Sequence, residues 1–326
     1  MPPIIQTTDL TKEYGEIKAV DHLSLEVEKG EVFGLLGPNG AGKTTTVGML
    51  TTIVRPTAGT ASVAGHSIIE APGLVRRSIG IVFQELSLDT VLTGRENLEM
   101  SAQLYGVPRA VRKKRIDELL ELVDLQSRAN SLVRTYSGGM KRRLELVRGL
   151  LHHPAVLFLD EPTLGLDPQS REVIWKYIGE MSKAEETTII LTTHYMEEAE
   201  MMCDRIAIID RGKAMKEGTP EALRASLGGD LVYLRSKSLD VAAIRALSFV
   251  KEVKVDADRA TVTVEKASAN LPELLRVVRN IDCVEVHSPT LNDVFLAYTG
   301  RQIREDEGSS TWLDDAMRVR NQGQGR

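Results

Sequence analysis

The chain has 326 residues and 42% of them are hydrophobic, so it can bury a sizeable core and is long enough for two domains. Its 41 basic and 46 acidic residues give a formal charge of −5, which does not support a general nucleic-acid-binding protein, because such proteins need a clustered basic face. No stretch approaches the roughly 18 apolar residues of a membrane span, and the first residues lack a secretory pattern. We therefore expect any membrane role to depend on another chain.

From Ile4 to about Leu227, apolar runs typical of strands alternate with amphipathic stretches typical of helices. This alternation predicts a layered α/β domain with a mostly parallel sheet, over residues 1–227. The clearest predicted strands are Val32–Leu36, Ala155–Leu159, Thr188–Thr192 and Ile206–Ile209.

A glycine-rich loop follows the first of these strands and precedes a predicted helix from Thr44 to Leu50. It consists of Gly37, Pro38, Asn39, Gly40, Ala41, Gly42, Lys43 and Thr44. Its glycines allow positive φ angles and a close approach of backbone N–H groups to a polyanion at the positive end of a helix dipole. In this context Lys43 is expected to reach the β- and γ-phosphates of a nucleoside triphosphate, and Thr44 to place its hydroxyl on Mg²⁺.

The strand pattern disappears between Leu88 and Thr135. Apolar residues recur there at helical spacing, at Ile116, Leu119, Leu120 and Val123. The periodicity predicts a helical subdomain over about residues 88–150. The basic run Arg112–Arg115 lies in this region, and two interpretations remain open for it, a solvated helix face and attraction to an anionic lipid surface.

Tyr136-Ser137-Gly138-Gly139-Met140 begins the next predicted helix, which runs through Leu151. Ser137 is suited to cap the helix, and the glycines allow close backbone approach, so this helix start is a candidate anion site. The alternative is a flexible turn that only starts a helix.

The apolar strand at 155–159 ends in two carboxylates, Asp160 and Glu161. Open α/β sheets bind their ligands at the carboxyl ends of the strands. In nucleotide hydrolases such an Asp supports Mg²⁺, and an adjacent Glu polarises the attacking water. Two solvated acids in a loop would be the alternative, and the phosphate loop argues against it.

After Gly228-Gly229 the pattern changes, which predicts a small α+β domain over residues 228–300. The expected elements are strand Leu231–Arg235, helix Asp240–Ala246, strands Lys251–Val255 and Ala260–Glu265, helix Leu271–Ile281 and strand Val284–His287. This order resembles a split β-α-β arrangement. Residues 301–326 contain five acidic and five basic residues and a lone Trp312, and we predict a mobile tail there.

The two cysteines, Cys203 and Cys283, lie far apart and have no neighbouring His or Cys at metal-ligand spacing. They are interpreted as small buried apolar residues of a cytosolic protein, with neither a disulfide nor a zinc site.

With three nucleotide-site motifs in this order, the chain resembles the ATP-binding cassette (ABC) ATPases over roughly residues 4–225. Further matches to that family stand at Tyr14, at Gln84 after Ile81-Val82-Phe83, at Asp167 after Leu164-Gly165-Leu166, and at His194 after Thr192-Thr193. Met140 replaces a usual glutamine and Tyr136 a usual leucine, which bears on subfamily rather than on activity. The resemblance implies a P-loop core with a mostly parallel sheet flanked by helices, an N-terminal antiparallel β portion and a helical subdomain.

The same resemblance implies roles for individual residues. Tyr14 would stack on adenine, and Gly37 to Thr45 would hold the phosphates of ATP, with Asp167 as a further nucleotide-site residue. Gln84 would contact Mg²⁺ and the attacking water. Mg²⁺ would also be held by Thr44 and Asp160; Glu161 would be the general base, and His194 would bind the γ-phosphate. Alternatives without a functional role stay open. Tyr14 would then be a surface aromatic, Gln84 a solvated amide, and His194 a histidine that ends a strand with its hydrogen bonds made within the fold.

In this family two cassettes meet head to tail, so Ser137, Gly138 and Gly139 are implied to act on the ATP bound to a partner. The sequence holds a single copy of each motif. A functional unit should therefore contain two copies of this chain, or one copy and a related cassette. ATP would bridge the two halves, and hydrolysis would remove the bridge.

The segment Pro289-Thr290-Leu291-Asn292-Asp293-Val294-Phe295-Leu296, with Thr299-Gly300, looks like the closing motif of daunorubicin-resistance-type exporter subunits. Asn292 stands where that group generally has an acidic residue. The resemblance implies export of a drug-like, lipid or glycolipid substrate through a separate membrane permease, with the chain held at the cytoplasmic face of the cell membrane. The helical subdomain would contact the permease.

Two other classes of function remain. One is a soluble cassette protein acting on ribosomes or DNA, which the single cassette and the acidic charge disfavour. The other is a nucleotide-gated assembly module with negligible turnover, which Glu161 disfavours because such modules tend to lack that base.

Overall fold

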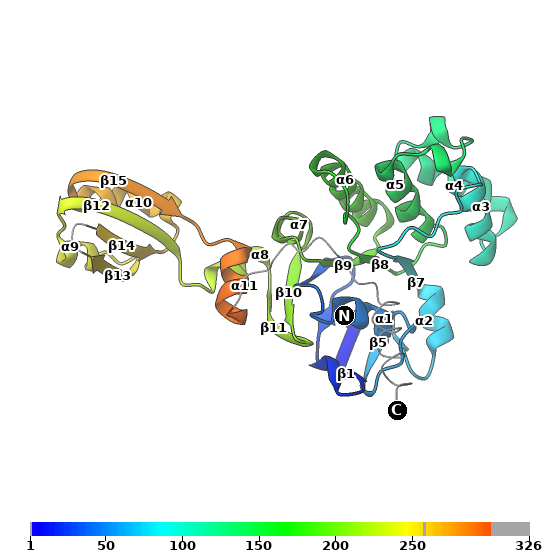
Figure 1. Cartoon of the computed structure of the whole chain (residues 1–326), viewed down its shortest axis with the longest axis horizontal. Coiled ribbons are helices and arrows are strands. Elements are labelled where there is room, and N and C mark those ends of the chain that lie inside the picture. Colours follow the sequence, from blue (N-terminus) through cyan, green and yellow to red (C-terminus); the bar gives the residue numbers. More distant parts are fainter. Residues whose placement is uncertain (1, 257–258, 301–326) are drawn as a thin grey trace, which may run out of the picture. The chain divides into compact units, whose positions relative to one another are not determined.

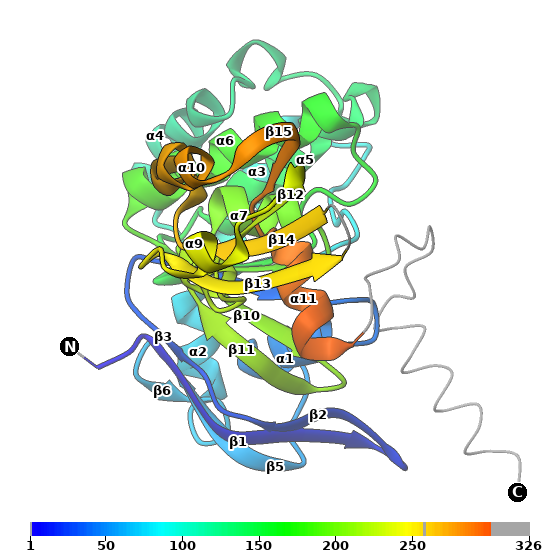
Figure 2. The same cartoon turned by 90° about the vertical axis from the view of Figure 1, so that its left-hand side faces the viewer.

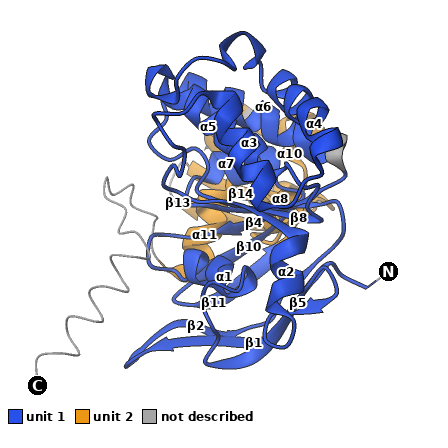
Figure 3. Cartoon of the chain, turned by 90° about the vertical axis from the view of Figure 1, so that its right-hand side faces the viewer, with its two compact units in different colours: residues 1–217, 304–326 blue, residues 218–303 orange. Residues whose placement is uncertain are grey.

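The structure, a computed structural model, describes residues 2–256 and 259–300. The tail predicted at 301–326 lies outside the described residues. The described chain divides into two compact units, one up to Glu217 and one from Gly218 onward, which Figure 3 colours separately. The division precedes helix α8 (Pro220–Ala225), whereas the sequence placed it at Gly228–Gly229. The difference arises because α8 packs against α11 (Leu291–Thr299) of the second unit.

In the described chain the first unit is built on a six-stranded sheet whose inner pairs are parallel. Its strand order is β11 (Lys213–Gly218), β10 (Arg205–Asp210), β4 (Val32–Leu36), β9 (Thr188–Thr193), β8 (Val156–Asp160) and β7 (Ile79–Val82). Strands β4, β8 and β9 are buried at every position, because helices cover both faces of the sheet.

The register of these strands brings separate motifs to one edge. Leu36 pairs with Thr193, and Asp160 pairs with Thr192. On the other side of β8, Val82 pairs with Leu159. The residues that follow β4, β7, β8 and β9 therefore all emerge at the carboxyl edge of the sheet, where α/β folds bind ligands.

A second, antiparallel sheet lies on the side of the parallel sheet that α1 covers (Figure 1). Its strand order is β2 (Ile17–Leu23), β1 (Ile5–Tyr14), β5 (Ala58–Val63) and β6 (His66–Ser67), and β3 (Glu26–Val27) also pairs with β1. Phe33 and Phe158 of the parallel sheet share one buried core with Val47 and Met49 of α1 and with Leu10 of β1. Burying a side chain of this size stabilises the fold by about 1.5–3 kcal/mol, so α1 is held firmly between the two sheets.

Helices of the first unit lie on both sides of the parallel sheet, and the views in Figures 1 and 2 agree on their layers. Helices α1 (Lys43–Leu50) and α2 (Pro72–Ser78) lie on the side of the antiparallel sheet. The opposite side carries α3 (Gly94–Leu104), α4 (Arg109–Leu122), α5 (Gly138–Gly149), α6 (Pro168–Glu185) and α7 (Met196–Met202), with the short turns η1 (Gln126–Arg128) and η2 (Val133–Thr135). Between β7 and β8 the described chain has no sheet strand, in agreement with the expected helical region.

The second unit of the described chain has a four-stranded antiparallel sheet with two helices between its strands. Its elements are β12 (Asp230–Ser238), α9 (Val241–Arg245), β13 (Val250–Asp256), β14 (Arg259–Val264), α10 (Ala267–Val277) and β15 (Arg279–His287). The sheet order β13-β14-β12-β15 is the split β-α-β arrangement predicted from the sequence. The unit has its own core, centred on Val232, Val262 and Leu274.

One predicted boundary in this unit was wrong. The sequence predicted a helix as far as Ile281, but α10 ends at Val277 and β15 begins at Arg279. Ile281 pairs with Ser236 of β12, so pairing with a distant strand overrides the local helical pattern.

Two further expectations concern single residues. Cys203 is buried, as expected, but Cys283 is only half-buried, and neither forms a disulfide in the described structure. In the basic run, Arg112 pairs with Glu99 at 2.8 Å, and Arg115 is buried and donates to the Leu150 carbonyl at 2.7 Å. Two of the four basic side chains thus turn into the protein, so the run forms neither a wholly solvated face nor a free cationic surface.

Candidate functional site

The glycine-rich loop occupies the turn between β4 and α1, and its glycines are required by their surroundings. A Cβ atom on Gly37 would lie 2.2 Å from the Ile209 carbonyl oxygen of β10. Gly42 has a φ of 103°, and a Cβ atom there would lie 2.3 Å from the Ala19 carbonyl oxygen of β2. The loop is therefore wedged between two sheets, and its backbone leads directly into the N-terminus of α1.

Lys43 opens α1, and its side chain is only 4% exposed. Its ammonium donates to the carbonyl oxygens of Gly37 at 2.7 Å and Pro38 at 3.1 Å, and it lies 3.3 Å from Glu161 Oε1. Burial lowers the pKa of Lys43, while the negative charge of Glu161 opposes this effect. The loop, the lysine and the acidic strand end thus form one continuous site.

Thr44 of helix α1 and Asp160 of strand β8 bring two oxygen ligands together. The Thr44 hydroxyl donates to Asp160 Oδ1 at 3.2 Å, and Thr192 of β9 donates to the same oxygen. Burial raises the pKa of Asp160, while the hydrogen bond from Thr192 opposes the increase. A hydroxyl and a carboxylate suit Mg²⁺, which usually takes one or two protein oxygens and completes its shell with phosphate and water.

Among the described residues no group of three or more His, Cys, Asp or Glu side chains could hold a metal ion alone. The donor set therefore fits a cation that arrives with a phosphate ligand rather than one caged entirely by protein.

Glu161 follows β8 with a φ of 45°, a conformation that is costly for a residue with a side chain. Its N–H is held by Thr192, through the carbonyl oxygen at 3.2 Å and the hydroxyl at 3.0 Å. Burial by itself raises the pKa of Glu161, but the contact from His194 and the charge of Lys43 outweigh it and hold the pKa below its usual value. The carboxylate is therefore kept ionised in a buried position.

His194 follows β9 and is nearly buried. Its Nδ1 lies 3.3 Å from Glu161 Oε1, and its ring lies 4.0 Å from the ring of Tyr195 between centroids. Beneath it, the buried Glu198 of α7 accepts from Thr193 at 2.5 Å and from the Thr163 hydroxyl. These contacts tie the end of β9 to the loop that follows Glu161.

Gln84 follows β7, one strand beyond β8, and is half-buried. The strand register places it at the same sheet edge as Glu161, because Val82 pairs with Leu159. Its carbonyl oxygen lies 3.5 Å from Arg142 Nη1 of α5.

Ser137 caps α5, since its hydroxyl accepts from the Met140 N–H at 3.3 Å. A Cβ atom on Gly138 would lie 3.8 Å from Leu166, and one on Gly139 would lie 3.6 Å from Ser170, both ordinary contacts. Neither Gly138 nor Gly139 has a positive φ angle. Nothing within the described chain therefore requires glycine at these two positions.

The remaining predicted site residues lie apart from this cluster. Tyr14 ends β1 in the antiparallel sheet, and the Lys12 ammonium lies 4.9 Å from its ring centroid. Asp167 caps α6 and accepts from Ser170 N–H at 3.0 Å and from its hydroxyl at 2.7 Å. The structure thus joins Lys43, Thr44, Asp160, Glu161 and His194 through direct contacts and neighbouring positions in the chain.

Sequence reasoning missed three residues that shape the site. They are Thr192, which holds both acids of the strand end, Glu198, which accepts from two threonine hydroxyls, and Arg142, which is buried beneath the acids. Arg142 stands within the basic run Lys141–Arg143, so nothing in the sequence indicated that this side chain is buried.

Two family models match the chain. The model "ABC transporter" matches residues 20–164, and the model "ATP-binding protein DrrA1-3-like, C-terminal domain" matches residues 218–299. The first match contains the loop and both acids, and the second begins where the structure divides into two units.

Similar proteins cover nearly the whole chain. The daunorubicin resistance ATP-binding protein DrrA3 of Streptomyces coeruleorubidus is 43% identical over 304 residues, covering 90% of this chain and 96% of that protein. The linearmycin resistance ATP-binding protein LnrL of Bacillus subtilis (strain 168) is 39% identical, covering 93% of this chain and all of that protein. The Nod factor export ATP-binding protein I of Ralstonia nicotianae is 40% identical, covering 93% and 96%.

Solved structures resemble the first unit. The cbiO1 protein of Clostridium perfringens, part of the ABC transporter complex cbiONQ, has a TM-score of 0.65 at 28% identity, covering 70% of this chain and 92% of that one. The ATP-binding cassette MJ0796, solved as a dimer in a post-hydrolysis state with ADP and Pi, has a TM-score of 0.59 at 27% identity, covering 66% and 98%.

Proposed function

The chain belongs to the ATP-binding subunits of ABC transporters, and from this premise we propose that it drives export of a drug-like, lipid or glycolipid substrate through a separate membrane permease. ATP hydrolysis is the activity of this family, and similar proteins are named for resistance to daunorubicin and linearmycin and for Nod factor export. The observation that carries the proposal is the buried cluster of Lys43, Glu161 and His194 beside the phosphate loop.

For the nucleotide itself, we propose that the loop backbone and the start of α1 bind the phosphates. The binding residues would be Gly37, Pro38, Asn39, Gly40, Ala41, Gly42, Lys43, Thr44 and Thr45. Backbone N–H groups at a helix N-terminus and a buried ammonium are suited to a polyanion. Tyr14 would stack on adenine, and Asp167 would be a further residue of the nucleotide site.

For the metal, Thr44, Asp160 and Gln84 would hold Mg²⁺. The cation would supply Lewis-acid stabilisation of the charge that develops on the phosphate oxygens. Thr44 and Asp160 already share a hydrogen bond of 3.2 Å, so their oxygens are oriented toward the same point. The buried carboxylate of Asp160 places a negative charge at this point, which a divalent cation would offset.

For the chemical step, Glu161 would accept a proton from the attacking water. Its pKa lies below the usual value, so it is ionised and able to accept a proton at neutral pH. His194 would hold the carboxylate in place and contact the γ-phosphate, and Gln84 would help to orient the water. The backbone bonds from Glu161 to Thr192 fix the direction of the carboxylate before ATP arrives.

A second cassette would complete the site through Ser137, Gly138 and Gly139. Among the residues that the structure describes, nothing requires glycine at positions 138 and 139, so their small size would serve a close approach from outside. The start of α5 also offers free N–H groups and a positive dipole end to an anion. We therefore propose that these residues bind the γ-phosphate held by a partner cassette, which is either a second copy of this chain or a related one.

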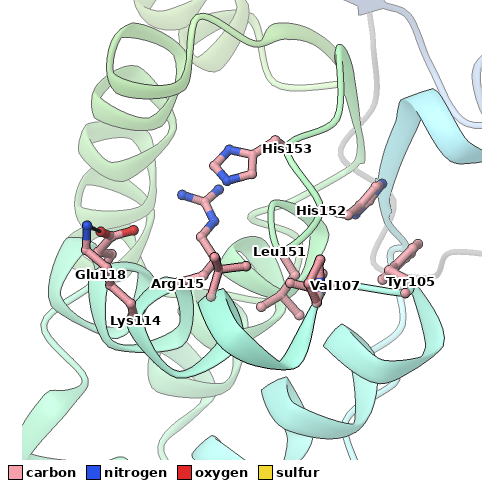
Figure 4. A pocket seen from close by; sticks show the side chains of 11 residues that line it. Tyr105, Val107, Lys114, Arg115, Glu118, Leu151, His152 and His153 are labelled. Atoms are coloured by element: carbon pink, nitrogen blue, oxygen red, sulfur yellow. Dashed lines mark ion pairs between the residues drawn. The ribbon is translucent and has the colours of Figure 1, made fainter.

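The helical region would contact the permease. In the described structure no helix is both long enough and apolar enough to span a bilayer. Near the junction of α3 and α4, Leu104 is 82% exposed and Val111 is 52% exposed. Beside them is a pocket of about 360 Å³ in which Tyr105 and His152 stack at 4.0 Å between ring centroids (Figure 4). An apolar permease segment at this place would hold the chain peripherally at the cytoplasmic face of the cell membrane.

The proposed transport function is tested with this protein and its permease together. The first step is to look beside the gene of this chain for one that encodes a multi-span membrane protein. We would then express the two together and measure ATP-dependent uptake of daunorubicin into inside-out vesicles. Uptake that requires ATP and is lost in Glu161→Gln supports drug export. If the purified chain hydrolyses ATP while daunorubicin, linearmycin and Nod factor are all left outside the vesicles, the proposed substrate class is wrong although the ATPase assignment stands.

A further inference from the structure

Arg142 is the most deeply buried arginine near the nucleotide site, with 4% of its surface exposed. It lies on α5, five residues after Ser137, and its guanidinium contacts two different strand ends. From β7 it reaches the carbonyl oxygens of Phe83 at 2.7 Å and Gln84 at 3.5 Å. From β8 it reaches the carbonyl oxygens of Asp160 at 3.4 Å, Glu161 at 3.1 Å and Pro162.

All five contacts are with backbone oxygens, so this arginine holds main chain rather than a single side chain. A buried cation normally requires a paired anion, and here Glu145, Asp160 and Glu198 supply negative charge nearby. Burial lowers the pKa of Arg142 to about 10, so the guanidinium remains charged at neutral pH.

Helix α5 also holds the segment after β7 through a second set of hydrogen bonds. The buried carboxylate of Glu145, one turn after Arg142, accepts from the Ser87 N–H at 3.2 Å and from its hydroxyl at 2.6 Å. Arg148, a further turn along, pairs with Glu145 at 2.7 Å and donates to the Ser87 carbonyl at 3.2 Å. Residues 83–87 are thus held at three points along one face of the helix.

The other end of α5 is locked to β7 by backbone contact. A Cβ atom on Gly80 would lie 2.2 Å from the Gly149 carbonyl oxygen, so the helix and the strand approach as closely as backbones can. Helix α5 therefore cannot slide along β7 without breaking this packing.

We propose that Arg142 is a positioning residue that joins the start of α5, the Gln84 segment and the Glu161 segment into one rigid body. The proposal rests on the function proposed above, in which Ser137 meets the nucleotide of a partner cassette. Contact at the start of α5 would then be transmitted directly to Gln84 and Glu161 of the same chain.

The guanidinium is the only side-chain group that fits this task. It presents five donors in a planar fork, so it can serve both strand ends at once. A lysine keeps the charge but has a single nitrogen, and it can bond one strand end or the other. Arg142→Lys therefore separates the linking role from the role of a buried positive charge.

The test compares Arg142→Lys and Arg142→Met with Arg143→Lys. Arg143 is the next residue on α5, and it contacts the Val123 carbonyl and the Tyr177 hydroxyl instead. For Arg142→Lys we expect kcat for Mg-ATP to fall by about tenfold or more while KM for ATP changes less than about twofold, because binding groups stay in place. Amide hydrogen exchange in residues 83–87 should become at least about tenfold faster, while β9 keeps its wild-type rate. Arg143→Lys should match the wild-type protein in all three measurements.

Two outcomes overturn the proposal. One is wild-type kcat in Arg142→Lys, or in Arg142→Met if that variant folds. The other is unchanged exchange in residues 83–87, which would show that Arg142 does not hold the segment. A wild-type protein that fails to hydrolyse Mg-ATP would instead count against the proposed function, so the two failures are distinguishable.

Discussion

The ammonium of Lys43 lies 3.3 Å from the carboxylate of Glu161, and 4% and 7% of these residues are exposed. Lys43 comes from the glycine-rich loop after β4, and Glu161 comes from the end of β8, with β9 between them in the sheet. His194, which follows β9, contacts the same carboxylate oxygen from its own strand. Three neighbouring strands thus supply a phosphate-binding cation, a base and a histidine to one buried point.

Replacing Glu161 by Gln should remove the proton acceptor but keep the shape of the site. We expect Mg-ATP hydrolysis to fall by about a hundredfold to ten-thousandfold, because that is the usual contribution of a general base. Binding of ATP, measured by calorimetry, should persist. The control is Glu172→Gln on the exposed side of α6, which should hydrolyse ATP normally. Unchanged turnover in Glu161→Gln would remove this residue from the mechanism.

An arginine at position 137 should obstruct the start of α5 without touching the loop of its own chain. Ser137→Arg is expected to abolish hydrolysis, since the side chain would fill the space in front of Gly138 and Gly139. Filter binding of ATP to the single chain should remain within about threefold of wild type, because Lys43 and its loop are intact. Thr60→Arg, on the exposed strand β5, is the control. Loss of ATP binding in Ser137→Arg would show that these residues serve the nucleotide of their own chain.

The pH profile of hydrolysis should report the environment of Glu161. The base is active when ionised, and its pKa lies below the usual value, so the acid limb of kcat/KM should fall below the range of an ordinary glutamate. His194→Gln removes the leading contact that lowers this pKa, so the acid limb should move to higher pH. His66→Gln, in the antiparallel sheet, should leave the limb in place. If the acid limb of kcat/KM lies at the same pH in His194→Gln as in the wild-type protein, the contact described for Glu161 is contradicted.

Glu198 offers a test of stability against pH. Burial raises the pKa of this carboxyl above its usual value. A group with a raised pKa in the folded state contributes stability below its unfolded pKa and loses that contribution as pH rises through the folded value. The free energy of unfolding of Glu198→Gln, relative to wild type, should therefore increase as the pH rises above the unfolded pKa of about 4.3. Glu197→Gln, exposed on the same helix, should give a constant difference. A constant difference for Glu198→Gln as well would contradict the raised pKa.

The boundary between the units can be tested with fragments. A fragment of residues 218–300 keeps α8, whose Leu223 is 1% exposed, packed on α11 with its buried Phe295. A fragment of residues 228–300 loses that helix and exposes the apolar face of α11. We expect the longer fragment to have a higher melting temperature in circular dichroism, because a buried leucine contributes about 1.5–3 kcal/mol. Equal melting temperatures would place the boundary at Gly228 instead.

Much of the fold followed from local patterns in the sequence. The fold class is confirmed, and β4 runs from Val32 to Leu36 as predicted, because a fully buried strand is a short apolar run that few other structures tolerate. Motif spacing and a resemblance along most of the chain identified the family. The family models and similar proteins bear this out. The roles of individual site residues stay predictions.

Contacts between segments that are distant in the sequence decided several features that local patterns cannot predict. The helix predicted to Ile281 ends at Val277 because β15 pairs with β12, and the unit boundary moves to Gly218 because α8 packs on α11. Arg142 belongs to the same class. Its sequence neighbours show only a basic run, and its five backbone partners lie at or just after the ends of β7 and β8, up to 59 positions away along the chain.

The residues of this sequence determined which chemistry is available, since a glycine-rich loop, two acids after an apolar strand and a histidine each carry their function in their side chains. The tertiary structure alone decided that Lys43, Glu161 and His194 meet at one oxygen. Hydrophobic periodicity specifies which face of a strand is buried, whereas the position of β4 beside β9 depends on pairing between residues more than a hundred positions apart.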